Sequence, residues 1–157
     1  MEQRPDRETL TRLVQFCKAR CAGDGDIRVF QVGDEHAFEG VTHFQPGLHP
    51  RVEVTFSTAG AYPLTQSYRL CLDHEADGGE CPEGCAAERA VSLGPAFELL
   101  SWEEFFVHVL AHELRHCEQW NDGRKFDLLE WERDAEEAAL AVVLQFRREQ
   151  RERRAAA

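Results

Sequence analysis

Two histidines four positions apart flank a glutamate in residues 112–116, and these residue types at this spacing can support metal chemistry. On an α-helix, residues four apart lie one above the other on the same face. His112 and His116 could therefore bind a single Zn²⁺ ion through two imidazole nitrogens. Glu113 would then project toward a water molecule on the metal. The competing interpretation is an amphipathic helix whose histidines are exposed or hydrogen-bonded.

The residues around this motif predict the helix that it needs. Ser101 and Glu104 form a capping-box pattern at the start of the helix. Gly123 is suited to a left-handed cap at its end. His108 lies one turn before His112 on the same face, and we expect it to be a packed or surface residue rather than a ligand; the alternative is a group that supports the ligands or faces the substrate. The buried side of the helix should consist of apolar residues at helical spacing: Phe105, Phe106, Val109, Leu110, Leu114 and Cys117.

A hydrolytic zinc site needs a third protein ligand, and the carboxylate-rich helical pattern of residues 127–140 offers one. Glu130 and Asp134 are four apart and share a face. With the 112–116 motif, residues 130–135 resemble the gluzincin group of HExxH zinc metallopeptidases (zincins). In that group a ligand glutamate is followed four residues later by an acidic or amide residue. The resemblance covers the last third of the chain. It implies that Glu130 is the third ligand and that Asp134 orients His112 or His116.

Other assignments of these acidic residues stay open. Glu132 is the main alternative ligand, and Asp134 could itself bind the metal. Alternatively, the acidic residues form a solvated face that pairs with nearby arginines. This solvated face is the favoured interpretation for Glu132, Glu136 and Glu137. The arginines available to it are Arg133, Arg147 and Arg148.

By this resemblance, the chain is a zinc-dependent peptidase with one catalytic Zn²⁺ ion and a peptide or protein substrate. Glu113 would act as the general base and pass the proton to the leaving amine. The alternative function is a regulatory or binding module that keeps a zincin-like site without proteolytic turnover. A metal-free structural domain is a further alternative, in which the histidines only complete a packed surface.

Composition limits the other classes of function. The chain has 157 residues, of which 43% are hydrophobic and 10% aromatic, as expected for one globular domain spanning residues 1–157. Its formal net charge of −11 argues against nucleic-acid binding and against binding to anionic membranes. We expect residues 1–5 and 150–157 to be flexible. The sequence makes no prediction about oligomeric state.

The N-terminal residues predict a cytoplasmic location. Residues 1–6 are charged and are not followed by an uninterrupted apolar segment, so they do not resemble a secretory signal. No stretch of the chain approaches the length of a transmembrane helix, and we expect no membrane association.

Six cysteines are many for a chain of this length, and in a reducing compartment thiol clusters suggest metal binding before disulfides. A four-thiolate site could join Cys17 and Cys21 to Cys81 and Cys85, and a disulfide between Cys81 and Cys85 is another alternative. We expect Cys117 to pack in the core. A second, structural zinc ion could use four residues of the middle region: Cys71, His74, Cys81 and Cys85.

The order of the predicted elements indicates an α+β fold of minimal zincin-like type. An N-terminal helix (residues 7–22) precedes a short twisted sheet, followed by the helix that carries the 112–116 motif and a C-terminal helix ending near Glu149. In a zincin layout an edge strand beside the cleft pairs with an extended substrate. Three to four strands are expected, with candidates at residues 27–32, 51–56, 67–72 and 88–93.

Overall fold

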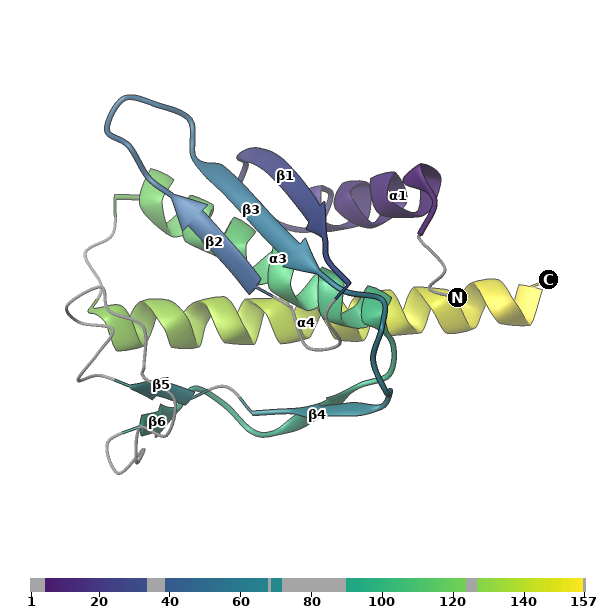
Figure 1. Ribbon diagram of the computed structural model, residues 1–157. Coiled ribbons are helices and arrows are strands. Elements are labelled where there is room, and N and C mark those ends of the chain that lie inside the picture. The colour runs from purple at the N-terminus through teal and green to yellow at the C-terminus, as the bar shows by residue number, and fades with distance from the viewer. Residues whose placement is uncertain (1–4, 34–38, 68, 72–89, 124–126, 157) are drawn as a thin grey trace.

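The computed structural model of the chain describes residues 5–33, 39–67, 69–71, 90–123 and 127–156. The described residues include three helices, α1 (Arg7–Lys18), α3 (Trp102–Asn121) and α4 (Leu128–Ala156) (Figure 1). Helix α1 begins where predicted, because the Asp6 carboxylate accepts a hydrogen bond from the N–H of Thr9 at 2.6 Å. It ends at Lys18, four residues before the predicted end.

Helix α3, which carries the 112–116 motif, has the predicted caps. The Ser101 hydroxyl accepts the N–H of Glu104 at 3.3 Å, and the Glu104 carboxylate accepts the N–H of Leu100 at 2.7 Å. At the other end, Gly123 has a φ of +62°, the left-handed conformation that glycine adopts without strain. Residues at its two ends therefore determine where this helix begins and ends.

Helix α4 begins after Asp127, whose carboxylate accepts the N–H of Glu130 at 2.8 Å. It continues to Ala156, so the predicted end near Glu149 is wrong. Glu149 is held by Arg20, which follows α1, at 2.5 Å, and by Gln145 at 3.2 Å. These contacts anchor the helix at the point where its apolar stripe ends.

A three-stranded mixed sheet lies against α3. Its strands are β1 (Asp26–Gln31), β2 (Glu39–His43) and β3 (Arg51–Phe56), in the order β1-β3-β2. The central strand β3 pairs in parallel with β1 and antiparallel with β2. Strands β1 and β3 were predicted from their alternating patterns, whereas β2 was not predicted.

Two further antiparallel pairs connect this sheet to α3. Strand β4 (Leu64–Gln66) pairs with β7 (Phe97–Leu99), and β5 (Arg69–Cys71) pairs with β6 (Ala90–Ser92). The β5 and β6 strands correspond to the predicted strands at residues 67–72 and 88–93. The α+β class is confirmed.

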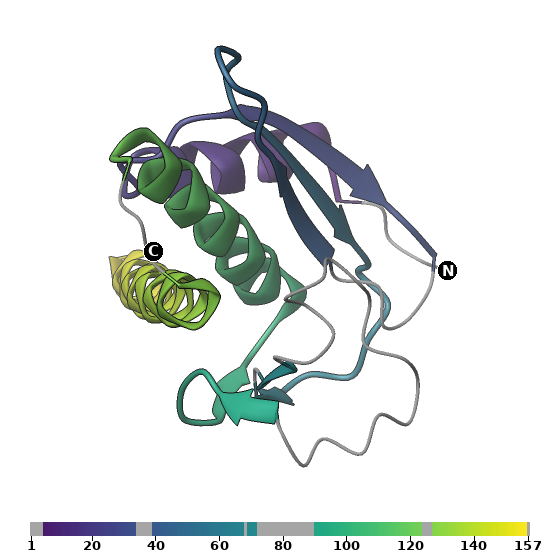
Figure 2. The ribbon, with the colours of Figure 1, turned by 90° about the vertical axis from the view of Figure 1, so that its left-hand side faces the viewer.

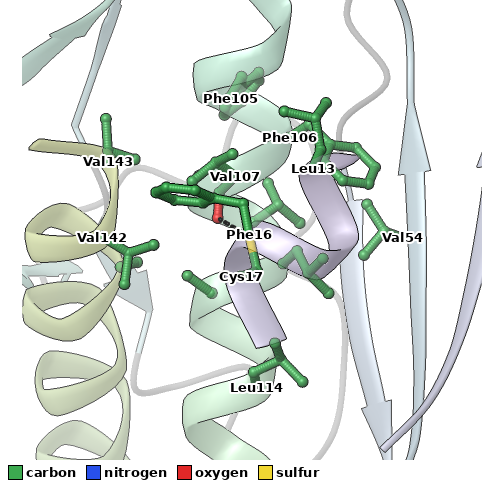
Figure 3. Packing of buried hydrophobic residues seen from close by; sticks show 14 of the residues in the cluster. Leu13, Phe16, Cys17, Val54, Phe105, Phe106, Val107, Leu114, Val142 and Val143 are labelled. Carbon is green, nitrogen blue, oxygen red and sulfur yellow. Dashed lines mark hydrogen bonds between the residues drawn. The ribbon is translucent and has the colours of Figure 1, made fainter. Parts of the chain in front are cut away.

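Helix α3 lies between the sheet and α4, so that it contacts other elements on several sides (Figures 1 and 2). Helix α1 packs against its middle, where the Cys17 thiol points at the carbonyl oxygen of Val107 at 3.8 Å (Figure 3). Fourteen residues of α3 are buried. A helix buried to this extent holds polar side chains in fixed positions. Among the described residues, no helix is both long and apolar enough to cross a lipid bilayer.

Candidate metal centre

His112, His116 and Glu132 converge where α3 meets α4, and they form the one group of potential metal ligands among the described residues. The Nε2 atoms of the two histidines are 3.1 Å apart. Glu132 Oε2 lies 3.1 Å from Nε2 of His112, and Glu132 Oε1 lies 3.3 Å from Nε2 of His116. Two histidines of α3 and one carboxylate of α4 thus build a triangle of donor groups, in which each oxygen of Glu132 faces one of the imidazoles.

The dimensions of this triangle fit a zinc ion. In tetrahedral coordination with bonds of about 2.0–2.1 Å, neighbouring ligand atoms are about 3.3 Å apart. The three distances match this spacing within a few tenths of an ångström. Two imidazoles and one carboxylate are also the ligand types of hydrolytic zinc sites, which leave a fourth position for water. The group therefore has the composition and the spacing of a three-residue zinc site.

Glu136, one turn after Glu132 on α4, holds His112 from behind. Its Oε2 lies 3.4 Å from Nδ1 of His112, and its Oε1 lies 3.0 Å from Nε2 of the fully buried His108. Burial disfavours a charged imidazole, but the hydrogen bonds to Glu132 and Glu136 outweigh it and raise the pKa of His112 to about 10. Burial alone would raise the pKa values of both carboxyl groups, but hydrogen bonds of Glu132 to His112 and His116, and of Glu136 to His108 and His112, lower them to about 2. The carboxylates of Glu132 and Glu136 therefore strongly favour a positive charge on the group that lies between them.

His116 is held by Gln119, one turn further along α3. Gln119 Oε1 lies 2.8 Å from Nδ1 of His116, while its amide nitrogen donates to the backbone oxygen of Trp131 at 3.0 Å and to Asp134 Oδ2 at 2.7 Å. Asp134 in turn accepts two hydrogen bonds from Arg115, at 2.7 and 3.0 Å. Each of the two histidines thus has Nδ1 facing an oxygen and Nε2 facing the centre of the triangle, an arrangement expected of imidazoles that can bind a metal.

Glu113 lies beside the triangle and is held by strand β2. The Thr42 hydroxyl donates to Glu113 Oε2 at 2.6 Å. A Cβ atom at Gly40 would lie 2.6 Å from Glu113 Oε1 and 2.7 Å from a methyl carbon of Val109, so a larger residue here would displace the Glu113 or Val109 side chain. Gly40 and Thr42 are two apart and therefore lie on the same face of the strand. β2 crosses α3 directly over the carboxylate.

A cavity of about 460 Å³ opens over these groups. Its polar lining consists of Thr42, Glu113 and the three residues of the triangle. The rest of the lining is glycine and apolar side chains: Gly40, Val41, Phe44, Val109, Leu128 and Trp131. The potential metal ligands and Glu113 therefore share one solvent-accessible space.

The structure places the acidic residues of α4 differently from the sequence-based assignment. Glu130 is exposed and lies outside the group of potential ligands, and Glu132 takes the position expected of it. Asp134 is linked to His116 through Gln119. The expected solvated face is correct for the exposed Glu137 and wrong for Glu136, which is 2% exposed. The physical reason is helical phase, because Glu132 and Glu136 continue the stripe of α4 that faces α3.

The predicted second zinc site cannot be placed. His74, Cys81 and Cys85 lie outside the described residues, and of Cys71 only the backbone is described. Burial raises the pKa values of Cys17 and Cys21, the latter to about 11, so both stay as thiols at neutral pH. Cys117 is fully buried, as predicted, and is not part of a disulfide.

Three residues of the site were not predicted: Gly40, Thr42 and Gln119. Gly40 and Thr42 belong to the strand that was missed. A signal for Gln119 was present, since it follows His116 by three positions and therefore shares its face of the helix. For Glu132 the signal was the apolar stripe of its own helix.

Comparison with known proteins finds no family model, no curated protein and no solved structure that matches this chain. The functional argument therefore depends on the geometry of the site.

Proposed function

We propose that this protein is a zinc-dependent metallopeptidase that uses Glu113 as its general base. The observation that carries the proposal is the triangle of His112, His116 and Glu132, whose three distances of 3.1–3.3 Å fit one zinc ion. The adjoining Glu113 favours hydrolysis over a purely structural metal site, since such sites have four protein ligands and no adjacent base.

The residues around the triangle support distinct roles in peptide hydrolysis. His112, His116 and Glu132 would hold a Zn²⁺ ion, which would supply Lewis acidity to activate water and to polarise a carbonyl group. Glu113 accepts the proton of the attacking water and later delivers it to the leaving amine. Because Thr42 donates to Oε2, the proton is carried on Oε1. Gln119 and Glu136 keep the two imidazoles in orientation.

Strand β2 is suited to bind an extended peptide. In the part of the chain that the structure describes, its hydrogen-bonded neighbour is β3 alone, so one edge of β2 is available for pairing. The same strand lines the cavity through Gly40, Val41 and Thr42. A peptide that pairs with this edge would pass over Glu113 and the triangle. This arrangement favours a peptide or protein substrate.

The proposal is tested by proteolysis with defined metal content. Protein loaded with one equivalent of Zn²⁺ is incubated with a denatured protein and with a library of internally quenched peptides. Cleavage should require zinc, stop on chelation, and be absent from Glu113→Gln while that variant still binds zinc. Equal cleavage by Glu113→Gln would refute the role of Glu113. Zinc binding without cleavage of any substrate would favour a zinc-dependent binding module instead.

A further inference from the structure

The cavity over the candidate metal centre has an apolar wall, formed by Phe44, Leu128 and Trp131. Phe44 immediately follows β2, and its ring meets that of Trp131 edge-on at 6.5 Å. Trp131 stacks on the ring of His116 with centroids 6.1 Å apart. Leu128 is one turn before Trp131 on α4 and therefore lies on the same face. The apolar wall is thus continuous with one of the potential metal ligands.

This wall leaves large apolar surface open to solvent. Leu128 is 38% exposed. Trp120, whose ring stacks on that of Phe44 with centroids 4.7 Å apart, is 39% exposed. Exposed leucine and tryptophan grouped beside a cavity usually mark a place where an apolar ligand binds. Leu144, an exposed leucine elsewhere on α4, is not part of the lining of this cavity.

The charges of the cavity select against an acidic ligand. Glu113 and Glu132 line it, and among the described residues no lysine or arginine does. A bound zinc ion would neutralise Glu132, but an acidic side chain would still face the Glu113 carboxylate, and a side chain of either charge would lose hydration against the apolar wall. The volume of about 460 Å³ accommodates one large side chain with its flanking backbone.

We infer that the apolar wall is a substrate subsite, which binds a bulky aromatic or aliphatic side chain beside the scissile peptide bond. This inference rests on the proposed peptidase function, because it assumes that the bound chain is a peptide lying over Glu113. It goes further by naming the class of peptide: one with phenylalanine, leucine or a similar residue next to the bond that is cut.

The test uses one host peptide in which a guest residue is placed at each position in turn. The guests are Phe, Leu, Ala, Glu and Lys. Zinc-loaded wild-type protein should cleave peptides with Phe or Leu at one position adjacent to the cut at least about tenfold more efficiently (kcat/KM) than the Ala peptide, as burial of a large side chain predicts. The Glu peptide should be the poorest substrate. Binding of the same peptides to zinc-loaded Glu113→Gln, measured by calorimetry, gives the same order without turnover.

Leu128→Glu tests the wall itself, with Leu144→Glu as the matched control on an exposed part of the same helix. In Leu128→Glu the advantage of Phe over Ala should fall to about twofold or less, and the Lys peptide should gain. Leu144→Glu should behave as wild type, and circular dichroism checks that both variants are folded.

The outcomes separate this inference from the proposed function. Selective binding of Phe and Leu peptides to Glu113→Gln, without cleavage by wild type, would support the subsite and refute the peptidase. Cleavage with no preference among guests, or with a preference that Leu128→Glu leaves intact, would support the peptidase and overturn the subsite. Neither binding nor cleavage of any peptide would overturn both.

Discussion

Oε1 of Gln119 lies 2.8 Å from Nδ1 of His116, and this contact fixes how the histidine faces the centre. The orientation of the Gln119 amide is set by two oxygens, the Trp131 carbonyl and the Asp134 carboxylate, which both need a donor. Its own oxygen must therefore point at His116. A proton on Nδ1 then satisfies that oxygen, and the lone pair on Nε2 points into the triangle.

We expect Gln119→Leu to weaken zinc binding about 10- to 100-fold, because the imidazole loses the acceptor that orients it. The measurement is a competition titration against a zinc-binding dye. Gln145→Leu is the matched control, since Gln145 contacts Glu149 on the far part of α4. Equal zinc affinities for the two variants would contradict this role.

The hydrogen bond from Thr42 to Glu113 predicts an effect on turnover rather than on metal binding. Thr42→Val keeps the shape of the side chain but removes the 2.6 Å contact to Oε2. Loss of a hydrogen bond to a charged group should lower kcat about tenfold while KM and zinc affinity stay close to wild type. Thr42→Ser should retain most activity. If Ser and Val lose activity alike, packing rather than the hydrogen bond is responsible.

Glu104 of α3 and Arg147 of α4 form an ion pair far from the candidate centre. Glu104 is 5% exposed and accepts two hydrogen bonds from Arg147, at 2.6 and 2.9 Å. Arg147→Leu would leave the Glu104 carboxylate buried without this partner and should lower the free energy of unfolding by about 3 kcal/mol. The exposed Arg148 gives the control, because Arg148→Leu should change stability by less than about 0.5 kcal/mol. Urea denaturation measures both.

The stability of the metal-free protein should be greatest at mildly acidic pH. The pKa values of Glu132 and Glu136 are lowered from 4.5 to about 2, so their contribution is present above pH 4.5 and is lost as the pH falls toward 2. The pKa of His112 is raised from 6.5 to about 10, so its contribution is present below pH 6.5 and is lost as the pH rises through 10. Thermal unfolding from pH 3 to pH 10 should show both slopes. The slope above pH 6.5 should be shallower in His112→Ala, and an unchanged slope would refute the role of His112.

Local signals in the sequence predicted the helices and much of the sheet. The caps at Ser101 and Gly123 fix α3, and regular alternation marks β1 and β3. These features depend on residues that are neighbours in the chain. They are therefore available without knowledge of the tertiary structure.

The third candidate ligand could have been found by extending a pattern that the sequence already contained. The apolar stripe of α4 runs through Phe146, Val143, Ala139 and Ala135. Counted back by seven residues, Ala139 leads to Glu132, whereas Glu130 falls on another face of the helix. Glu130 and Asp134 are four residues apart, as in the family that they resemble, but Glu132 and Glu136 are four residues apart as well. This spacing alone therefore does not identify the third ligand.

Strand β2 could not be predicted because one of its residues, Gly40, is explained only by a tertiary contact. Glycine is unfavourable within a strand, and at Gly40 a larger residue would displace the Glu113 or Val109 side chain. The partner residues are some seventy positions away in the chain. A glycine in such a position becomes informative only once the packing is known.

Zinc titration of wild type, Glu132→Ala and Glu130→Ala decides whether His112, His116 and Glu132 form a zinc site. We expect wild type to bind one equivalent of zinc, Glu132→Ala to bind it at least about 100-fold more weakly, and Glu130→Ala to bind it as wild type does. Absence of zinc binding by the wild type, or a larger loss in Glu130→Ala than in Glu132→Ala, would rule out this site.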